Sequence, residues 1–382
     1  MRTIPFHKPD LGEAEIEAVK QALRNSWITM GPRTIEFEQS FGKYIGSPHS
    51  VAVNSATAAL HLGLLAAGIK KGDEVIIPAF TFAATAEVVF HAGAVPVMVD
   101  VDRDTHCIST EALERAITPK TKAIIPVHYS GLPCDMDEII EIARNRNIYI
   151  IEDAAHSLPS WYKGKKIGTI GDITCFSFYA TKTLTTGEGG MLVTGNEEWA
   201  KRSRRLRLHG ISRDAWKRYT AEGTWHYDLD EPGFKYNTTD INSSIGLVQL
   251  ERLELMWQKR KSIAERYSDA FRKVDGLIVY PELKDRVSSH YLYPLKLDLG
   301  VLTISRNEFI DMLQKEGVQA SVHFIPLYRF SYYKNDYKIQ DFKTCEWIFE
   351  RILSLPVYPG MSDDDVSHVI SSVIKIIKGN TR

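Results

Sequence analysis

One stretch, residues 148–194, constrains the fold of this chain most, because its apolar runs end abruptly in polar and charged residues. The first run, Ile148 to Ile151, stops at Glu152 and Asp153. A short, continuous apolar run is typical of a strand buried on both faces of a parallel sheet. The carboxyl ends of such strands form the edge of an open α/β sheet where ligands bind. The sequence therefore predicts an acidic side chain at a ligand-binding edge.

A single lysine follows the second apolar run of this stretch. The run extends from Ile173 to Tyr179, and Lys182 comes in the turn after it. A lysine between packed strands and small residues can act as an amine nucleophile, which forms a Schiff base with a carbonyl group. Pyridoxal phosphate (PLP) is a carbonyl cofactor that needs such a lysine and an acid beside its ring nitrogen. Lys182 and Asp153 fit these roles, although an Asp that caps a helix and a solvated Lys would give the same local sequence.

Several motifs in a fixed order carry a resemblance to a known family. They are Glu152-Asp153-Ala154-Ala155-His156, Gly171-Asp172, Ser177-Phe178, and Lys182 with Gly187-Glu188-Gly189-Gly190. They resemble the core of the DegT/DnrJ/EryC1/StrS family of PLP-dependent sugar aminotransferases, and the similarity extends over nearly the whole chain. A dehydratase branch of that family carries histidine in place of the Schiff-base lysine. The lysine at position 182 therefore favours transamination.

The resemblance also implies a fold. Alternating strand and helix patterns indicate a doubly wound, mainly parallel sheet. The family has fold type I of the PLP-dependent transferases, an α/β fold with a mainly parallel sheet, of the seven-stranded type, between helices. We expect this large PLP-binding domain at residues 1–250, with an N-terminal segment that can pack on the smaller domain. Residues 251–382 are expected to form a linker helix and a small α+β domain.

The start of a helix supplies a candidate phosphate site. Ser55, Ala56 and Thr57 precede an alanine-rich helix, whose free N–H groups and dipole suit an anion. A plain Ser/Thr cap has the same signature. The family usually has Gly-Thr where this chain has Ala56-Thr57, a difference that concerns the geometry of the turn.

Further cofactor contacts follow from the resemblance alone. In the family, the position of Phe82 stacks on the cofactor ring, and that of His156 reaches its phenolic oxygen. Ser177 matches a phosphate-binding serine. Asn237 matches an asparagine that binds the phosphate of the neighbouring subunit's cofactor. The resemblance thus implies a homodimer with an active site shared across the interface.

Candidate sugar-binding residues lie in loops. Trp27 and Thr29 offer an aromatic face and a hydroxyl that could hold a sugar or a base, although a Trp that anchors the loop onto the core is equally consistent. In the resembling family this segment lines the nucleotide-sugar site. Glu188 is placed to contact the substrate or the lysine. His323 and Tyr328 belong to a loop that in this family closes over the sugar nucleotide.

Two charged segments have open interpretations. Residues 201–207, KRSRRLR, are strongly basic. They are expected either to form a solvated helix face or to meet an acidic surface or a nucleotide diphosphate. Residues 215–230, rich in Trp, Tyr and charge, are expected to form a lid or an interface loop.

The composition of the chain, and the motifs that it lacks, argue against several other classes of protein. The formal net charge of −1 gives no electrostatic reason to expect nucleic acid or an anionic membrane as a partner. The four cysteines show no CxxC spacing, so we expect reduced thiols in a cytoplasmic protein. No apolar stretch approaches the roughly 18 residues of a membrane span. The Walker A, G-x-G-x-x-G and HExxH patterns are unmet, and we therefore expect no nicotinamide or metal site.

The sequence is thus interpreted as a PLP-dependent aminotransferase of amino-sugar and polysaccharide biosynthesis. Its expected substrates are a nucleotide-linked keto sugar, a 4-keto-6-deoxy hexose on UDP or dTDP, and L-glutamate as the donor. Two alternatives stay open. One is a transaminase that is specific for C3 or for a keto sugar or cyclitol without a nucleotide. The other is a regulatory or sensor protein with the PLP fold but without efficient turnover.

Overall fold

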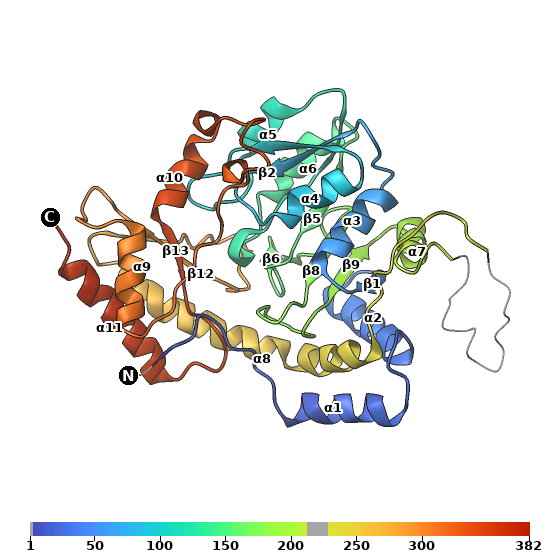
Figure 1. Cartoon of the computed structure of the whole chain (residues 1–382), viewed down its shortest axis with the longest axis horizontal. Helices are drawn as coiled ribbons and strands as arrows, with labels where there is room; N and C mark the ends of the chain where they lie inside the picture. Colours follow the sequence, from blue (N-terminus) through green and yellow to red (C-terminus); the bar gives the residue numbers. More distant parts are fainter. Residues whose placement is uncertain (1–2, 212–227) are drawn as a thin grey trace.

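The fold is described from a computed structural model, which covers residues 3–211 and 228–382. Its centre is a seven-stranded sheet in the order β1-β9-β8-β5-β4-β2-β3 (Figure 1). The strands are β1 His49–Val53, β2 Glu74–Pro78, β3 Val95–Val99, β4 Thr121–Ile124, β5 Tyr149–Asp153, β8 Ile173–Ser177 and β9 Gly190–Thr194. Strand β9 runs antiparallel to β1 and β8, and the other neighbours are parallel. The prediction of a mainly parallel, seven-stranded α/β sheet is confirmed.

Helices cover this sheet, as Figure 1 shows. They are α2 Pro32–Ile45, α3 Ala56–Ala66, α4 Ala84–His91, α5 Thr110–Ala116, α6 Met136–Arg144 and α7 Glu197–Leu206. Helix α3 packs on β5, β8 and β9 and also on α4 and α7. Because it is enclosed by the sheet and by other helices, α3 is apolar around most of its circumference. The first turn of α3 is thereby held at the edge of the sheet where β5 and β8 end.

A long helix connects the two ends of the molecule. Helix α8 spans Asp240–Phe271, 32 residues, and packs against both α1 Glu13–Arg24 and α11 Asp363–Lys378. In Figure 1 it runs along the lower part of the molecule, with the sheet above it and α1 below it. Its first half contacts the large core through Leu247 and Leu253, and its second half carries Tyr267 and Phe271 into a second core. The predicted domain boundary at residue 250 therefore falls inside a continuous helix.

The second core is built around a small sheet. This sheet has the order β10-β12-β13, with β10 Leu277–Val279, β12 Tyr293–Leu297 and β13 Ile352–Leu355, and is joined by α9 Arg306–Lys315. The N-terminal segment packs here too, since Ile4 is buried in this core and its N–H donates to the Gly317 carbonyl at 2.8 Å. Helix α10, Lys343–Arg351, returns to the large core instead. A third, short sheet consists of β11 Arg286–Val287, β6 Trp161–Tyr162 and β7 Lys165–Lys166.

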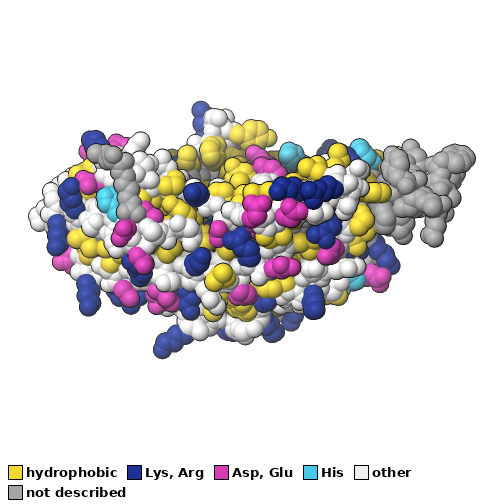
Figure 2. Space-filling model, turned by 90° about the horizontal axis from the view of Figure 1, so that it is seen from below, with side chains coloured by type: hydrophobic (Ala, Val, Ile, Leu, Met, Phe, Trp, Pro, Cys, Tyr) yellow, Lys and Arg dark blue, Asp and Glu magenta, His cyan; other side chains and the backbone are white. Residues whose placement is uncertain are grey.

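The face that carries α1 and α8 bears side chains of both charges, in agreement with the nearly neutral composition of the chain. In Figure 2, basic and acidic side chains alternate over this face, with apolar side chains between them. No helix of the described residues is both long enough and apolar enough to cross a membrane. Most of the predicted lid or interface loop at residues 215–230 lies outside the described residues.

Candidate active site

A cavity of about 450 Å³ lies where β5 and β8 end and α3 begins. It collects most of the side chains that the sequence singled out. Those that line it are Ser55, Ala56, Thr57, Phe82, Asp153, His156, Ser177, Lys182, Glu188 and His323. These residues lie on separate elements, and the sheet brings them together because its strands end along one edge.

Asp153 is the last residue of β5 and is held rigidly. Its side chain is 6% exposed. One carboxylate oxygen accepts a hydrogen bond from Thr85 Oγ1 at 2.9 Å, and the other accepts from the Ala155 N–H at 3.1 Å. Burial raises the pKa of Asp153, while these hydrogen bonds and the charge of Lys182 oppose the rise. The result is an oriented acidic group at the bottom of the cavity.

The residue before it, Glu152, belongs to a buried network on the other side of the strand. Successive side chains of a strand point to opposite faces, so Glu152 faces away from the cavity. Its carboxylate lies 2.8 Å from His128 Nε2, and it accepts hydrogen bonds from the Gly171 N–H at 2.8 Å and Thr174 Oγ1 at 2.6 Å. Both Glu152 and His128 have fully buried side chains. This network fixes the end of β5, and no local sequence pattern indicates it.

Lys182 lies in the turn after β8 and reaches into the cavity. Its amine Nζ lies 4.2 Å from the centre of the Tyr291 ring. The hydroxyl groups of Tyr291 and of Thr181, the neighbour of Lys182, are 2.9 Å apart. The Lys182 amine and the fixed Asp153 carboxylate therefore line the same cavity.

His156 is a neutral hydrogen-bond donor toward the cavity. The Ser130 N–H donates to its Nδ1 at 3.3 Å, so the proton of the neutral ring is on Nε2. Burial, and then the charges of Lys182 and His323, hold the pKa of His156 well below its usual value of 6.5. A neutral imidazole with an N–H group is suited to donate to a ligand oxygen.

The other end of the cavity is suited to an anion. Ser55 has an extended backbone and caps α3, with its Oγ accepting from the Ala58 N–H at 3.1 Å. The N–H groups of Ala56 and Thr57, in the first turn of the helix, have no intrahelical acceptor. Strand β9 passes so close that a Cβ atom on Gly190 would lie 2.4 Å from the carbonyl carbon of Ser55. Glycine at this position therefore leaves the helix N-terminus room to face the cavity, where a phosphate would bind.

An aromatic ring lies beside this anion site. Phe82 follows β2 and is 60% exposed, with its ring 5.9 Å from that of Phe324. An exposed phenyl group in a cavity offers a flat apolar face to a flat ligand. The cavity thus offers the kinds of contact that PLP needs. They are an anion site for its phosphate, the Phe82 ring for its face, and Asp153, His156 and Lys182 for its ring nitrogen, phenolic oxygen and aldehyde.

Comparison with known proteins identifies the family. The model of the DegT/DnrJ/EryC1/StrS aminotransferase family matches residues 9–374. The chain belongs to this family. The predicted family and enzyme class, an aminotransferase, are therefore confirmed.

Individual relatives match over nearly their full length. The spore coat polysaccharide biosynthesis protein SpsC of Bacillus subtilis is 46% identical over 379 residues, which cover 98% of this chain and 97% of SpsC. The PMP form of the putative sugar aminotransferase Spr1654 from Streptococcus pneumoniae has a TM-score of 0.93 and 38% identity, covering 98% of this chain and 99% of Spr1654. Helicobacter pylori PseC, an aminotransferase involved in the biosynthesis of pseudoaminic acid, has a TM-score of 0.92 and 28% identity, covering 99% and 100%.

Some residues expected from the family do not line the cavity in this chain. Trp27 Nε1–H donates to the Met30 carbonyl at 3.2 Å, as in a tryptophan that anchors its own loop. In the same loop, the exposed Thr29 uses its carbonyl to accept from the Asp240 N–H at 3.0 Å. Asn237 donates from Nδ2 to the Thr238 carbonyl at 2.9 Å, and its Oδ1 is buried without a partner in the described chain.

Tyr328 is the clearest departure from the expected sugar site. It is 1% exposed, stacks on Phe342 at 4.3 Å and donates to Glu346 Oε1 at 2.6 Å. The structure thus places it in the large core beneath α10, because its ring and hydroxyl both find partners there. Tyr328 does not reach the cavity.

The structure also reveals wall residues that sequence reasoning missed. They are Phe6, Leu60, Thr81, Ala84, Val127, Ala155, Tyr179, Thr181, Gly189, Tyr291, Ser321 and Phe324. Phe6 comes from the N-terminal segment and stacks on His323 at 5.3 Å. Tyr291 lies 110 positions after Thr181, which it contacts. The aromatic character of Tyr291 was visible in the sequence, but no local pattern indicates a contact over such a separation.

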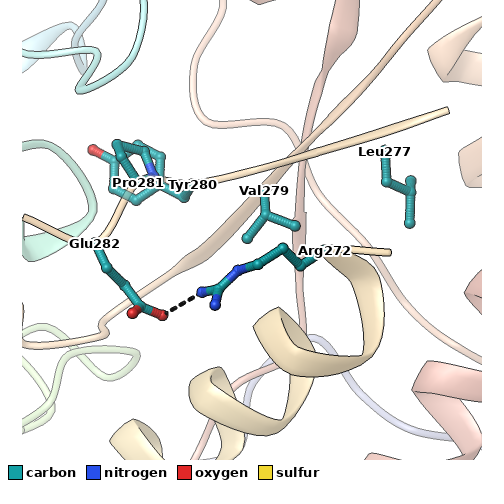
Figure 3. Close-up of a pocket in the computed structure, with 6 residues that line it drawn as sticks. All are labelled: Arg272, Leu277, Val279, Tyr280, Pro281 and Glu282. Atoms are coloured by element: carbon teal, nitrogen blue, oxygen red, sulfur yellow. Dashed lines mark hydrogen bonds and ion pairs between the residues drawn. The ribbon is translucent and has the colours of Figure 1, made fainter. Parts of the chain in front are cut away.

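A second hollow lies apart from this site, at the end of α8. Figure 3 shows its lining residues, among them Arg272 and Glu282, whose ion pair at 3.0 Å crosses it. None of the predicted site residues lines it. The cavity at the ends of β5 and β8 is therefore the candidate active site.

Proposed function

We propose that this aminotransferase, which is PLP-dependent and acts on a sugar, moves the amino group of L-glutamate to the C4 keto group of a nucleotide-linked 4-keto-6-deoxy hexose. The observation that carries the proposal is the arrangement of Lys182 and Asp153 around one cavity, beside the N-terminus of α3. The names of its relatives agree with a sugar substrate, since SpsC is a polysaccharide biosynthesis protein and PseC acts in pseudoaminic acid biosynthesis. UDP and dTDP are the expected nucleotides.

Different residues of the cavity would bind different parts of PLP. Lys182 would bond the cofactor covalently, and Asp153 would pair with its ring nitrogen. The phosphate would be held by hydroxyl and backbone N–H groups of residues 55–57 and by Ser177. His156 would donate to the phenolic oxygen, and Phe82 would cover one face of the ring. When bound, PLP supplies an electron sink for the carbanion that forms at the substrate carbon.

The protein's own groups move the protons. Once the amino donor has displaced it, the Lys182 amine would act as a general base that takes the proton from the donor's Cα and passes it to the cofactor. In the second half of the reaction the same amine would carry a proton from the cofactor to C4 of the sugar. The Asp153 carboxylate, held by Thr85 and Ala155, would pair with a protonated ring nitrogen. Burial of Asp153 and His156 keeps water away from these groups.

The sugar would extend from this centre toward His323, Phe6 and Glu188. His323 lines the cavity and is fixed by a 3.0 Å contact between its Nδ1 and Ser354 Oγ. The carbonyl of Glu188 accepts from Asn242 Nδ2 at 2.8 Å, which holds the glycine-rich turn in place. We expect the reaction to take place in the cytoplasm, in agreement with four free, buried cysteines.

The experiment that tests this function uses ¹⁵N-labelled L-glutamate. The purified protein with PLP is incubated with a UDP- or dTDP-linked 4-keto-6-deoxy hexose, and the product is analysed by NMR. We expect ¹⁵N bonded to C4 of the sugar. Label at C3, or turnover only with a cyclitol or free keto sugar, would support the alternative transaminases. Cofactor binding without any labelled product would support a regulatory protein.

We further propose a homodimer in which Asn237 contacts the phosphate bound by the partner. The segment before Asn237 is tied to the rim of the cavity, because the Asn54 N–H donates to the Tyr236 carbonyl at 2.8 Å. Exposed apolar residues on α1 and α8, such as Ile16, Leu23 and Leu255, offer a contact surface.

Mixed dimers test this sharing. A Lys182→Ala chain and an Asn237→Ala chain, each inactive alone, are unfolded and refolded together. One site of each mixed dimer would then be intact, so about a quarter of the wild-type activity should return at equal ratio. No recovery, with mixed dimers verified by native mass spectrometry, would contradict a shared site.

A further inference from the structure

Tyr291 occupies the centre of the candidate active site, although it comes from the part of the chain that forms the small sheet. Its side chain is 7% exposed and lines the cavity just before β12. It contacts two of the groups that would hold the cofactor. Lys182 Nζ lies 4.2 Å from its ring centre, and the His156 ring lies 4.4 Å away at an angle of 35°.

The backbone and hydroxyl of Tyr291 fix this ring. The Tyr291 N–H donates to Ser289 Oγ at 3.2 Å, and that hydroxyl donates to the His156 carbonyl at 2.5 Å. A Cβ atom on Gly131 would lie 1.9 Å from Ser289 Oγ, so glycine there makes room for this link. The Tyr291 hydroxyl is held 2.9 Å from Thr181 Oγ1. The ring therefore has one orientation, face toward the lysine amine.

The face of an aromatic ring attracts a cation, because the ring quadrupole is negative above its plane. Among the residues that the structure describes, no carboxylate oxygen lies within 4.0 Å of Lys182 Nζ. The ring is thus the group that holds the charged amine at the cavity. It binds the ammonium form more strongly than the neutral amine.

From these contacts we propose that Tyr291 is a positioning residue, whose ring face receives the Lys182 amine whenever that amine is free. This role rests on the proposed function, in which Lys182 releases the cofactor to the amino donor. The ring keeps the released amine beside the reacting carbon and within reach of it, and Thr181 keeps the ring in place. Loss of the ring would let the amine leave this position, which slows both proton transfers.

The test measures the amine directly in the protein without cofactor. Wild type, Tyr291→Phe and Tyr291→Leu are treated with an amine-acetylating reagent, and the labelling rate of Lys182 is read by mass spectrometry. We expect the Phe variant to label within about twofold of wild type. The Leu variant should label about 2 to 30 times faster, the range that a cation–π contact corresponds to.

An internal control comes from a second lysine that lies on a tyrosine ring. Lys166 Nζ is 3.6 Å from the Tyr44 ring centre, far from the cavity lining, and its labelling rate should not change in any Tyr291 variant. Fluorinated phenylalanine at position 291 distinguishes the electrostatic effect of the ring from its steric effect. Fluorine weakens the ring quadrupole, while the ring keeps its shape. Labelling should rise with fluorine number even if the Leu variant fails to fold.

Turnover provides the second measurement. We expect kcat to fall in the order Phe, fluorinated Phe, Leu, with little change in the KM for the amino donor. Equal labelling of Lys182 in wild type, fluorinated and Leu proteins would overturn the proposal, whether or not the enzyme aminates a sugar. If labelling depends on the ring but no keto sugar is aminated, the contact stands and the proposed substrate is wrong.

Discussion

The bottom of the cavity and its outer rim differ in how the chain builds them. The bottom consists of Asp153, His156 and Lys182, which lie at or just after the ends of neighbouring strands. Asp153 and His156 are buried and hydrogen-bonded, and the half-buried Lys182 lies against the Tyr291 ring. The rim was expected to contain Trp27, Thr29, Glu188, His323 and Tyr328, of which Glu188 and His323 line the cavity and the other three do not. Strand ends converge because the sheet forces them to, whereas loop side chains follow whichever partners they find. The residues proposed to carry out the chemistry are therefore positioned more firmly by the fold than those proposed to bind the sugar.

Lys182→Ala should have the largest effect, because it removes both the covalent attachment of the cofactor and the general base. We expect kcat to fall by at least about 10⁴-fold and the visible absorbance of protein-bound PLP to change. Steady-state kinetics and absorbance spectra measure the two effects. Lys163→Ala, which changes an exposed lysine paired with Asp137, is the control and should behave as wild type. Normal turnover in Lys182→Ala would refute the assigned role.

Asp153→Asn should have the next largest effect. The variant keeps the size of the side chain but loses the charge that stabilises a protonated ring nitrogen, so kcat should fall about 10² to 10³-fold. Asp172→Asn is a control, since Asp172 comes directly before β8, does not line the cavity, and uses its carboxylate to accept from the Ile150 N–H at 2.8 Å. If both variants lose activity equally, the special role of Asp153 is not supported.

The rim should respond more weakly and unevenly. His323→Gln should raise the KM for the nucleotide sugar about tenfold with little change in kcat, because one polar contact to the substrate is lost. Tyr328→Phe should leave both constants within about twofold. Its cost should instead be about 1 kcal/mol in the free energy of unfolding, from the lost hydrogen bond to Glu346. A large KM effect in Tyr328→Phe would mean that its loop rearranges to meet the substrate.

The last expected effect concerns the pH dependence of stability and leaves the chemistry untouched. Burial, helped by the charge of Lys182, lowers the pKa of His323 from 6.5 to about 4. Between pH 6.5 and 4 the unfolded chain then binds more protons at this site than the folded chain, so the free energy of unfolding falls as the pH falls. His323→Gln should make this decline less steep, by no more than about 3 kcal/mol in total. Denaturant unfolding at several pH values measures it, and an unchanged slope would contradict the buried, neutral state.

Sequence reasoning recovered the bottom of the cavity for a physical reason. An apolar run that stops at Asp153, and another that leads to Lys182, report where strands end, and strand ends share one edge of the sheet. Glu152 belongs to the same motif as Asp153. Its partner His128, however, lies 24 positions earlier, in the connection between β4 and β5. Such a pairing depends on which strands become neighbours.

The basic segment at residues 201–207 shows the opposite case. Its charges are used inside the chain: Arg207 is 5% exposed and pairs with Glu38, and Arg202 pairs with Glu231 at 2.8 Å. Lys201, 51% exposed, stays on the expected solvated face, whereas Arg202 and Arg207 are paired within the chain. Their carboxylate partners come from distant parts of the sequence, so charge counting along the chain could not reveal them.

The most direct test of the central claim is to locate the covalent bond between the protein and its cofactor. The protein with PLP is reduced with borohydride, digested and analysed by mass spectrometry. We expect a pyridoxyl group on the peptide that contains Lys182, and on that lysine alone. A group on another lysine, such as the buried Lys296, or no stable modification at all, would contradict it.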